Sequence, residues 1–195
     1  MPRPRSEDRR NAIMSAAARV IASQGLGAAT AVIAKEAGVS NGSLFVYFDT
    51  KTALLNELYV ALKAELGAAV VAGLPVAGEA REQVRHLWTQ WSQWAAAYPY
   101  RRRALAQLQV ADDITAESRQ RAHSAMTGAA DVLEGSRAEG PMRDVPLGFV
   151  LVLISAIAEA AIDEMIREPA QAEARSSVAF DAIWRVLAGP AAPAL

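Results

Sequence analysis

Asn41, Ser43, Tyr47 and Lys51 bring amide, hydroxyl and ammonium groups together in one short stretch, VSNGSLFVYFDTK. Groups of these kinds bind phosphate oxygens and read base edges in nucleic acids. Taken alone, the stretch also has the features of a β-hairpin, because Asn-Gly is a strong turn signal and aromatic and β-branched residues favour strands. Whether these groups can act together therefore depends on the element that carries them.

The neighbouring residues favour a helix for this stretch. The segment before it reads AKEAGVS, a helical pattern with a glycine stop, so a hairpin would lack its first strand. Ser40 is a suitable N-cap, and Leu44 and Phe48 recur four residues apart on one face. We expect a helix over 41–47 that depends on packing, because an isolated helix needs about 12–15 residues.

A second short helix, AVIAKEAG, precedes this one, with Thr30 as its expected N-cap and Gly38 as its end. Two short helices joined by a tight turn form a helix-turn-helix, whose second helix enters the DNA major groove by its N-terminal end. A cation in the first turn of a helix is unfavourable, so we interpret Lys51 as a phosphate contact. The residues expected to face DNA from the second helix are Asn41, Gly42, Ser43, Phe45 and Tyr47, although Phe45 and Tyr47 could instead belong to the core.

The charge of the chain is unevenly distributed. The formal net charge is -1, so affinity for nucleic acid must come from a local patch. Residues 1–63 carry 8 Lys/Arg and 5 Asp/Glu, whereas residues 64–195 carry 12 and 16. Four arginines, including Arg5, precede the first apolar pattern. They could form an arm on the DNA phosphates or in the minor groove, or a solvated tail.

The composition argues against several other classes of protein. The absence of cysteine excludes disulfides, thiolate metal sites and a cysteine nucleophile. With two histidines and no glycine-rich phosphate loop, we expect no enzyme, metal or cofactor, although Glu159 and Asp163 form a close acidic pair. The N-terminus lacks the pattern of a signal peptide. The apolar segment Val145–Ile162 has too short an uncharged part to span a bilayer, so we expect a buried helix and a cytoplasmic protein.

Helical periodicity continues along the chain, and no stretch shows sustained period-two alternation. The 195 residues therefore predict an all-α protein of about nine helices. We expect a helix-turn-helix DNA-binding domain over residues 1–50 and a ligand-binding and dimerisation domain over 51–195. Besides the helices around the helix-turn-helix, the first of which should start near Ser6, the expected helices cover 79–98, 100–110, 115–137, 146–167 and 171–187.

The segment IMSAAARVIASQGLGAATAVIAKEAGVSNGSLFVYFDTKTALLNEL resembles the DNA-binding domain of the TetR (tetracycline-repressor-like) transcriptional regulators. The shared features include the glycine after the first helix, IAKEAGVS, and Gly-Ser-Leu-aromatic-x-Tyr-Phe ending in lysine. The resemblance implies a three-helix head that binds DNA through Thr30, Asn41, Gly42, Ser43, Phe45, Tyr47 and Lys51. Two residues depart from the family: Phe45 stands where members often have tyrosine, and Ala31 where some have a base-reading arginine.

The segment HLWTQWSQWAAAY predicts an aromatic face on a helix of the larger domain. Trp91 and Trp94 share that face and Trp88 adjoins it, so the three could line a pocket for a small molecule. His123 and Met126 are further candidates for ligand contacts. The alternatives are core packing for the tryptophans and a structural role for the histidine.

The last two helices are suited to a homodimer interface. Their apolar stripes and small residues would allow four helices from two subunits to pack as a bundle. On the first of them, Ser155, Glu159 and Asp163 are spaced four apart, and Arg167 would complete an ion pair with Asp163. We therefore expect a homodimeric repressor that binds double-stranded DNA at a palindromic operator and is released by a small apolar or aromatic inducer. An enzyme, or an adaptor that binds proteins through Val145–Ile162, are the alternatives.

Overall fold

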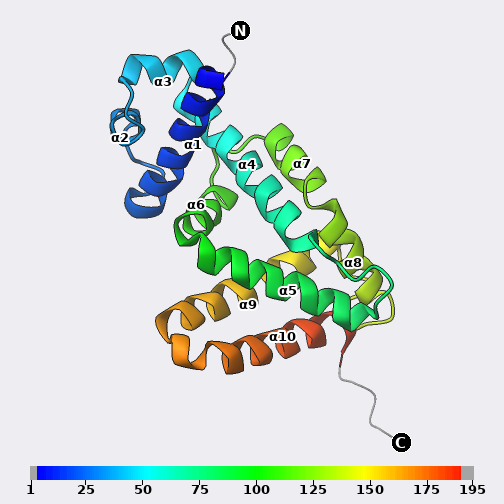
Figure 1. Cartoon of the computed structure of the whole chain (residues 1–195). Helices are drawn as coiled ribbons and strands as arrows, with labels where there is room; N and C mark the ends of the chain where they lie inside the picture. The colour runs from blue at the N-terminus through cyan, green and yellow to red at the C-terminus, as the bar shows by residue number, and fades with distance from the viewer. Residues whose placement is uncertain (1–3, 190–195) are drawn as a thin grey trace, which may run out of the picture. The chain divides into compact units, whose positions relative to one another are not determined.

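Figure 1 shows the computed structural model of the chain, which describes residues 4–189, with side chains from Ser6 onward. Every regular element in this part is helical, so the all-α prediction is confirmed, with ten α-helices where about nine were expected. A short 3₁₀ helix, η1 (Pro169–Gln171), lies between the last two. The α-helices are α1 (Pro4–Gln24), α2 (Thr30–Glu36), α3 (Asn41–Tyr47), α4 (Lys51–Val71), α5 (Ala80–Ala97), α6 (Pro99–Gln109), α7 (Ala116–Ser124), α8 (Thr127–Arg137), α9 (Leu147–Arg167) and α10 (Ala172–Ala188).

The chain packs as two compact units. The first contains the residues up to Leu66 together with Tyr98–Met126, and the second contains Gly67–Ala97 and the residues from Thr127 onward. Helix α4 therefore begins in the first unit and ends in the second. We expected DNA binding to reside in residues 1–50 and ligand binding and dimerisation in residues 51–195. The two packing units do not test this assignment of functions, so it stays a prediction.

Helix α1 contacts α2 and α6 in the first unit (Figure 1). Its buried stripe contains Ile13, Ala17 and Ile21, as the helical spacing predicted. The helix starts at Pro4 rather than at Ser6. Proline is favoured in a first turn, because its ring presets the backbone and the N–H that it lacks would have no partner there.

Two further expectations about helix ends are wrong. Thr30 is the first residue of α2 rather than its N-cap, because Ala29 has the extended backbone of the cap position and no side chain caps the helix. The helix expected over 115–137 is divided into α7 and α8. The N–H of Met126 turns back to the carbonyl of His123 at 2.9 Å, and Thr127 and Gly128, both poor helix formers, follow.

Helices α5, α8, α9 and α10 form the second unit, and α9 and α10 lie side by side (Figure 1). Helix α9 buries one residue per turn against its neighbours, namely Val150, Ile154, Ala158 and Ile162. None of the helices described has the length and hydropathy needed to cross a membrane. Arg167 pairs with Glu164, one turn before it on α9, and the expected pair with Asp163 stays a prediction.

The loop after α8 is fixed by close backbone packing. Gly140 lies so near the end of α10 that a Cβ atom at this position would be 1.8 Å from the carbonyl oxygen of Leu187. The guanidinium of buried Arg137 donates to the carbonyls of Met142 and Val145 and pairs with Glu134, which holds the same loop. A glycine is therefore required at position 140 because no side chain fits there.

Gly140→Ala should lower the free energy of unfolding by about 1–3 kcal/mol, because the added methyl group forces the backbone apart. The matched control is Gly135→Ala inside α8, where an added Cβ meets nothing within 4 Å. This control should raise stability by about 0.5–1 kcal/mol. Urea unfolding followed by circular dichroism measures both, and equal midpoints for Gly140→Ala and the parent chain would contradict the close approach.

Candidate nucleic-acid interface

Helix α3 has the boundaries and the cap that the sequence predicted. Ser40 has an extended backbone, and its Oγ accepts a hydrogen bond from the N–H of Ser43 at 3.1 Å. The hydroxyl groups of Ser40 and Ser43 also lie within 2.9 Å of each other. At the other end, the N–H of Phe48 donates to the carbonyl of Leu44 at 3.1 Å. Both ends of this short helix are therefore fixed by local hydrogen bonds.

The inner face of α3 belongs to the core of the first unit. Leu44 and Phe48 are buried, as are Ile33 of α2 and Leu54 of α4. The turn between α2 and α3 is tight because Gly38 adopts a φ of +69°, which a glycine tolerates at no steric cost. The N–H of Val39 then donates to the carbonyl of Ala34 at 2.9 Å, which ends α2. Helices α2 and α3 therefore have the arrangement of a helix-turn-helix.

Most of the residues predicted to face DNA are accessible. Asn41, Gly42, Ser43 and Phe45 are exposed, so the alternative in which Phe45 belongs to the core is wrong. Three others are half-buried: Thr30, Tyr47 and Lys51. Arg5 lies in α1, but its side chain is outside the part of the chain that the structure describes.

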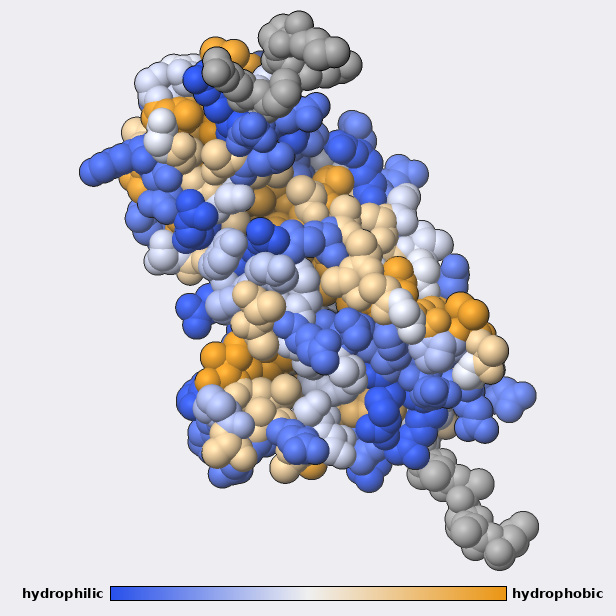
Figure 2. All heavy atoms as spheres, viewed as in Figure 1, coloured by the Kyte–Doolittle hydropathy of each residue, from blue (hydrophilic) through white to orange (hydrophobic). Residues whose placement is uncertain are grey.

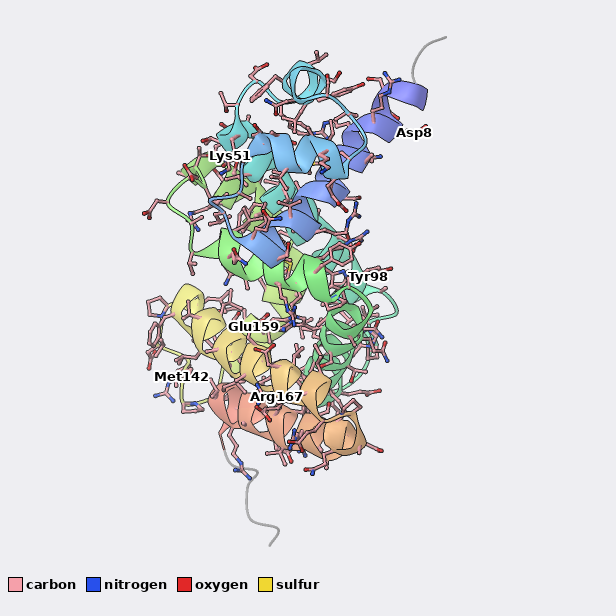
Figure 3. The ribbon with its side chains drawn as sticks, turned by 90° about the vertical axis from the view of Figure 1, so that its left-hand side faces the viewer. Asp8, Lys51, Tyr98, Met142, Glu159 and Arg167 are labelled. Carbon is pink, nitrogen blue, oxygen red and sulfur yellow. The ribbon has the colours of Figure 1, made fainter. Side chains whose placement is uncertain are left out.

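Lys51 lies at the start of α4, immediately after the loop that follows α3 (Figure 3). Thr50 caps this helix, since its Oγ1 accepts from the N–H of Ala53 at 3.0 Å. Lys51 therefore occupies the first turn, where the helix dipole is unfavourable for a cation and favourable for an anion. A phosphate beside Lys51 would be attracted by both the ammonium group and the helix end.

A charged network that the sequence did not predict connects α1, α4 and α7 within the first unit and reaches Phe48, the residue that follows α3. Glu57 accepts from Arg10 at 2.9 Å and from Arg121 at 3.2 Å. The guanidinium of Arg10 also lies over the ring of Phe48, 5.1 Å from its centroid. A single carboxylate thus links α7 to the residue that braces α3. Sequence spacing could not reveal it, because its members are 47 and 64 residues apart.

Helix α6, which belongs to the first unit, is held there by half-buried polar side chains, including Arg101 and Gln107. Burial acts to lower the pKa of Arg101, but its hydrogen bonds to Glu65 and Tyr100 outweigh burial and raise the pKa above the usual arginine value. Gln107 donates to the carbonyl of Ile21 at 3.1 Å, which fastens α6 to α1.

Burial also raises the pKa of Tyr59 on α4, an effect that nearby Arg119 partly opposes. Arg101 is therefore charged and Tyr59 neutral near neutral pH.

The residues predicted to bind a ligand are divided between the two units. Trp88, Trp91 and Trp94 belong to the second unit, whereas His123 and Met126 belong to the first. The indole N–H of Trp88 donates to the carbonyl and hydroxyl oxygens of Ser176 at 3.1 and 2.9 Å, so it already has acceptors. Trp94 is buried, Trp91 is partly accessible and His123 is exposed. Within residues 4–189, no cluster of acidic residues and histidines could hold a metal ion.

Comparison with known protein families agrees with this geometry. A family model described as "Bacterial regulatory proteins, tetR family" matches residues 13–58, which include α2, α3 and the start of α4. This region of the chain is of the TetR type. The match and the helix-turn-helix together support a DNA-binding transcription regulator.

Solved structures of TetR-family regulators resemble the whole chain. One from Shewanella sp. PV-4 is 26% identical, with a TM-score of 0.82 over 92% of this chain and 98% of that one. FadR from Bacillus subtilis, in complex with stearoyl-CoA, is 17% identical, with a TM-score of 0.67 over 93% and 99%. LfrR from Mycobacterium smegmatis, in complex with proflavine, is 20% identical, with a TM-score of 0.65 over 95% and 98%.

Replacing Ser40 with alanine should weaken α3 without unfolding the protein. The variant removes the acceptor for the N–H of Ser43, which costs about 1 kcal/mol in a helix N-cap. Hydrogen exchange of the α3 amides should therefore become about fivefold faster, while the amides of α9 keep their rates. Ser40→Asp is the control, because a carboxylate restores the acceptor. If Ser40→Ala left exchange in α3 unchanged, the cap would have no energetic role.

Proposed function

We propose that this TetR-family regulator is a homodimeric repressor that binds a palindromic operator and leaves it when a small apolar or aromatic molecule binds. The observation that carries the proposal is the exposure of Asn41, Gly42, Ser43 and Phe45 on a short helix whose opposite face is anchored in the core. DNA is the partner to which such a helix-turn-helix is suited. We infer that the regulator acts in the bacterial cytoplasm, where its operator would lie.

The accessible apolar face of α9 supports a dimer. Phe149 and Val152 are more than half exposed, and the small residues Ala156 and Ala160 continue the same side of the helix. Val178 on the neighbouring α10 is also exposed, and hydrophobic surface is visible over these two helices (Figure 2). A twofold axis through this face would bury the apolar residues of both subunits and present two copies of α3 to two half-sites.

The contacts within the first unit offer a route by which an inducer could act on α3. Helix α6 is fastened to α1 through Gln107, and Glu57 links α7 to Arg10 and thereby to Phe48. A ligand that shifts α6 or α7 would disturb the support of α3. Release requires only a coupling of about 1–3 kcal/mol between the two sites. The expected ligand contacts on α5 of the second unit are Trp88, Trp91 and Trp94, and those in the first unit are His123 and Met126. The ligands of FadR and LfrR, an acyl-CoA and an aromatic dye, are consistent with such an inducer.

Selection of bound fragments from random duplex DNA tests the proposal as a whole. We expect a palindromic sequence whose half-sites lie about one helical turn apart or a multiple of it. Adding fatty acyl-CoA esters and planar aromatic cations to the selected complex should identify molecules that release it. Selection of no sequence above background would contradict the proposal.

Lys51→Ala and Tyr47→Ala should each weaken binding to the selected operator by about tenfold, or about 1.4 kcal/mol. For Lys51→Ala, the slope of log affinity against log salt should also fall by about 1 per subunit, because one phosphate contact is lost. Arg103→Ala is the control, because it removes an exposed cation of α6 outside the helix-turn-helix. Fluorescence anisotropy at several salt concentrations provides the measurement. Equal slopes for Lys51→Ala and Arg103→Ala would exclude the phosphate contact.

Val152→Glu should convert the dimer to monomers, because it places a charge in the proposed apolar interface. Val76→Glu is the matched control in the same unit, since Val76 is 81% exposed in the loop between α4 and α5. Light scattering after size-exclusion chromatography gives the mass of each variant. A dimer that survives Val152→Glu would place the interface elsewhere.

A further inference from the structure

The helix-turn-helix exposes bulky apolar side chains as well as polar ones. Val32 of α2 and Phe45 and Val46 of α3 are large hydrophobic residues with accessible surface, and Val46 is 80% exposed. In Figure 2, hydrophobic surface appears among hydrophilic surface over the α2–α3 part of the first unit. The core of this unit does not include Val46, so its side chain is available for a contact outside the chain.

Val46 lies on the side of α3 that faces away from the core. Each residue of an α-helix advances about 100°, so Val46 is about 200° from Leu44, which is fully buried. Gly42 lies one turn before Val46 and shares its face. The outermost surface of α3 is therefore formed by a residue without a side chain and by a branched apolar residue.

The polar groups of α3 are few. The helix, NGSLFVY, contains no charged residue, and Asn41 supplies its only amide side chain. The hydroxyl of Ser43 is already within hydrogen-bonding distance of Ser40 Oγ, at 2.9 Å. The bidentate contacts by which arginine reads guanine are thus not available from this helix. An exposed valine offers a different contact, because thymine presents a methyl group in the major groove.

We propose that Val46 determines part of the operator sequence by packing against the C5-methyl group of a thymine. The inference rests on the proposed DNA-binding function and specifies what one side chain reads. Gly42 contributes by leaving room, one turn earlier on the same face, for the backbone of α3 to approach the base edges. Each half-site of the operator then contains a thymine whose methyl group, rather than its hydrogen-bonding edge, is recognised.

Deoxyuridine substitution in the selected operator tests this contact, because it removes only the methyl group of thymine. Each thymine of the site is replaced in turn, and the affinity of the full-length protein is measured by anisotropy. We expect one thymine per half-site at which deoxyuridine weakens binding by about fourfold, the effect of one buried methyl-sized group. The other thymines should tolerate the change.

Val46→Ala assigns the contact to this residue. The variant should bind the thymine and deoxyuridine operators equally. The control is Val110→Ala, which alters an equally exposed valine at the end of α6. This control should keep the fourfold difference between the two operators. If the parent chain binds its operator but no thymine methyl depends on Val46, this inference fails and the proposed function stands. If no operator can be selected, both fail together.

Discussion

Seven residues are too few to remain helical in water, so α3 exists because the rest of the first unit holds it. Leu44 and Phe48 bury its inner face in the core to which Ile33 and Leu54 also belong, and Ser40 closes its first turn. The remaining face does not contribute to this packing. Its residues are therefore free to vary with the DNA sequence to be read, while the anchoring residues keep the helix in place.

Phe48, which helps to hold α3 in place, also connects this helix to other helices of the first unit. Phe48 lies beneath the guanidinium of Arg10, and Arg10 shares the carboxylate of Glu57 with Arg121 of α7. The support of α3 thus depends partly on charges carried by α4 and α7. In a TetR-family regulator, such a connection offers a physical basis for the control of DNA binding. A small movement of α7 would change the contacts that stabilise α3, a helix too short to be stable alone.

Much of the first unit could be predicted from the sequence because its signals are local. The Ser40 cap, the glycine turn at position 38 and the spacing of Leu44 and Phe48 each act within a few residues, and together they excluded the hairpin. The break between α7 and α8 was missed because it depends on which unit each helix packs in. The Glu57 network was missed because charge pairing between distant residues leaves no periodic pattern.

The exposure of α3 toward DNA can be tested most directly by site-specific crosslinking, for which the absence of cysteine makes the chain well suited. Ser43→Cys and, as the control, Ser124→Cys on α7 would each carry a photoreactive label in the complex with the selected operator. Both serines are exposed. We expect the label at position 43 to crosslink to bases in both half-sites and the label at position 124 not to do so. Crosslinking from position 124 alone would contradict this expectation.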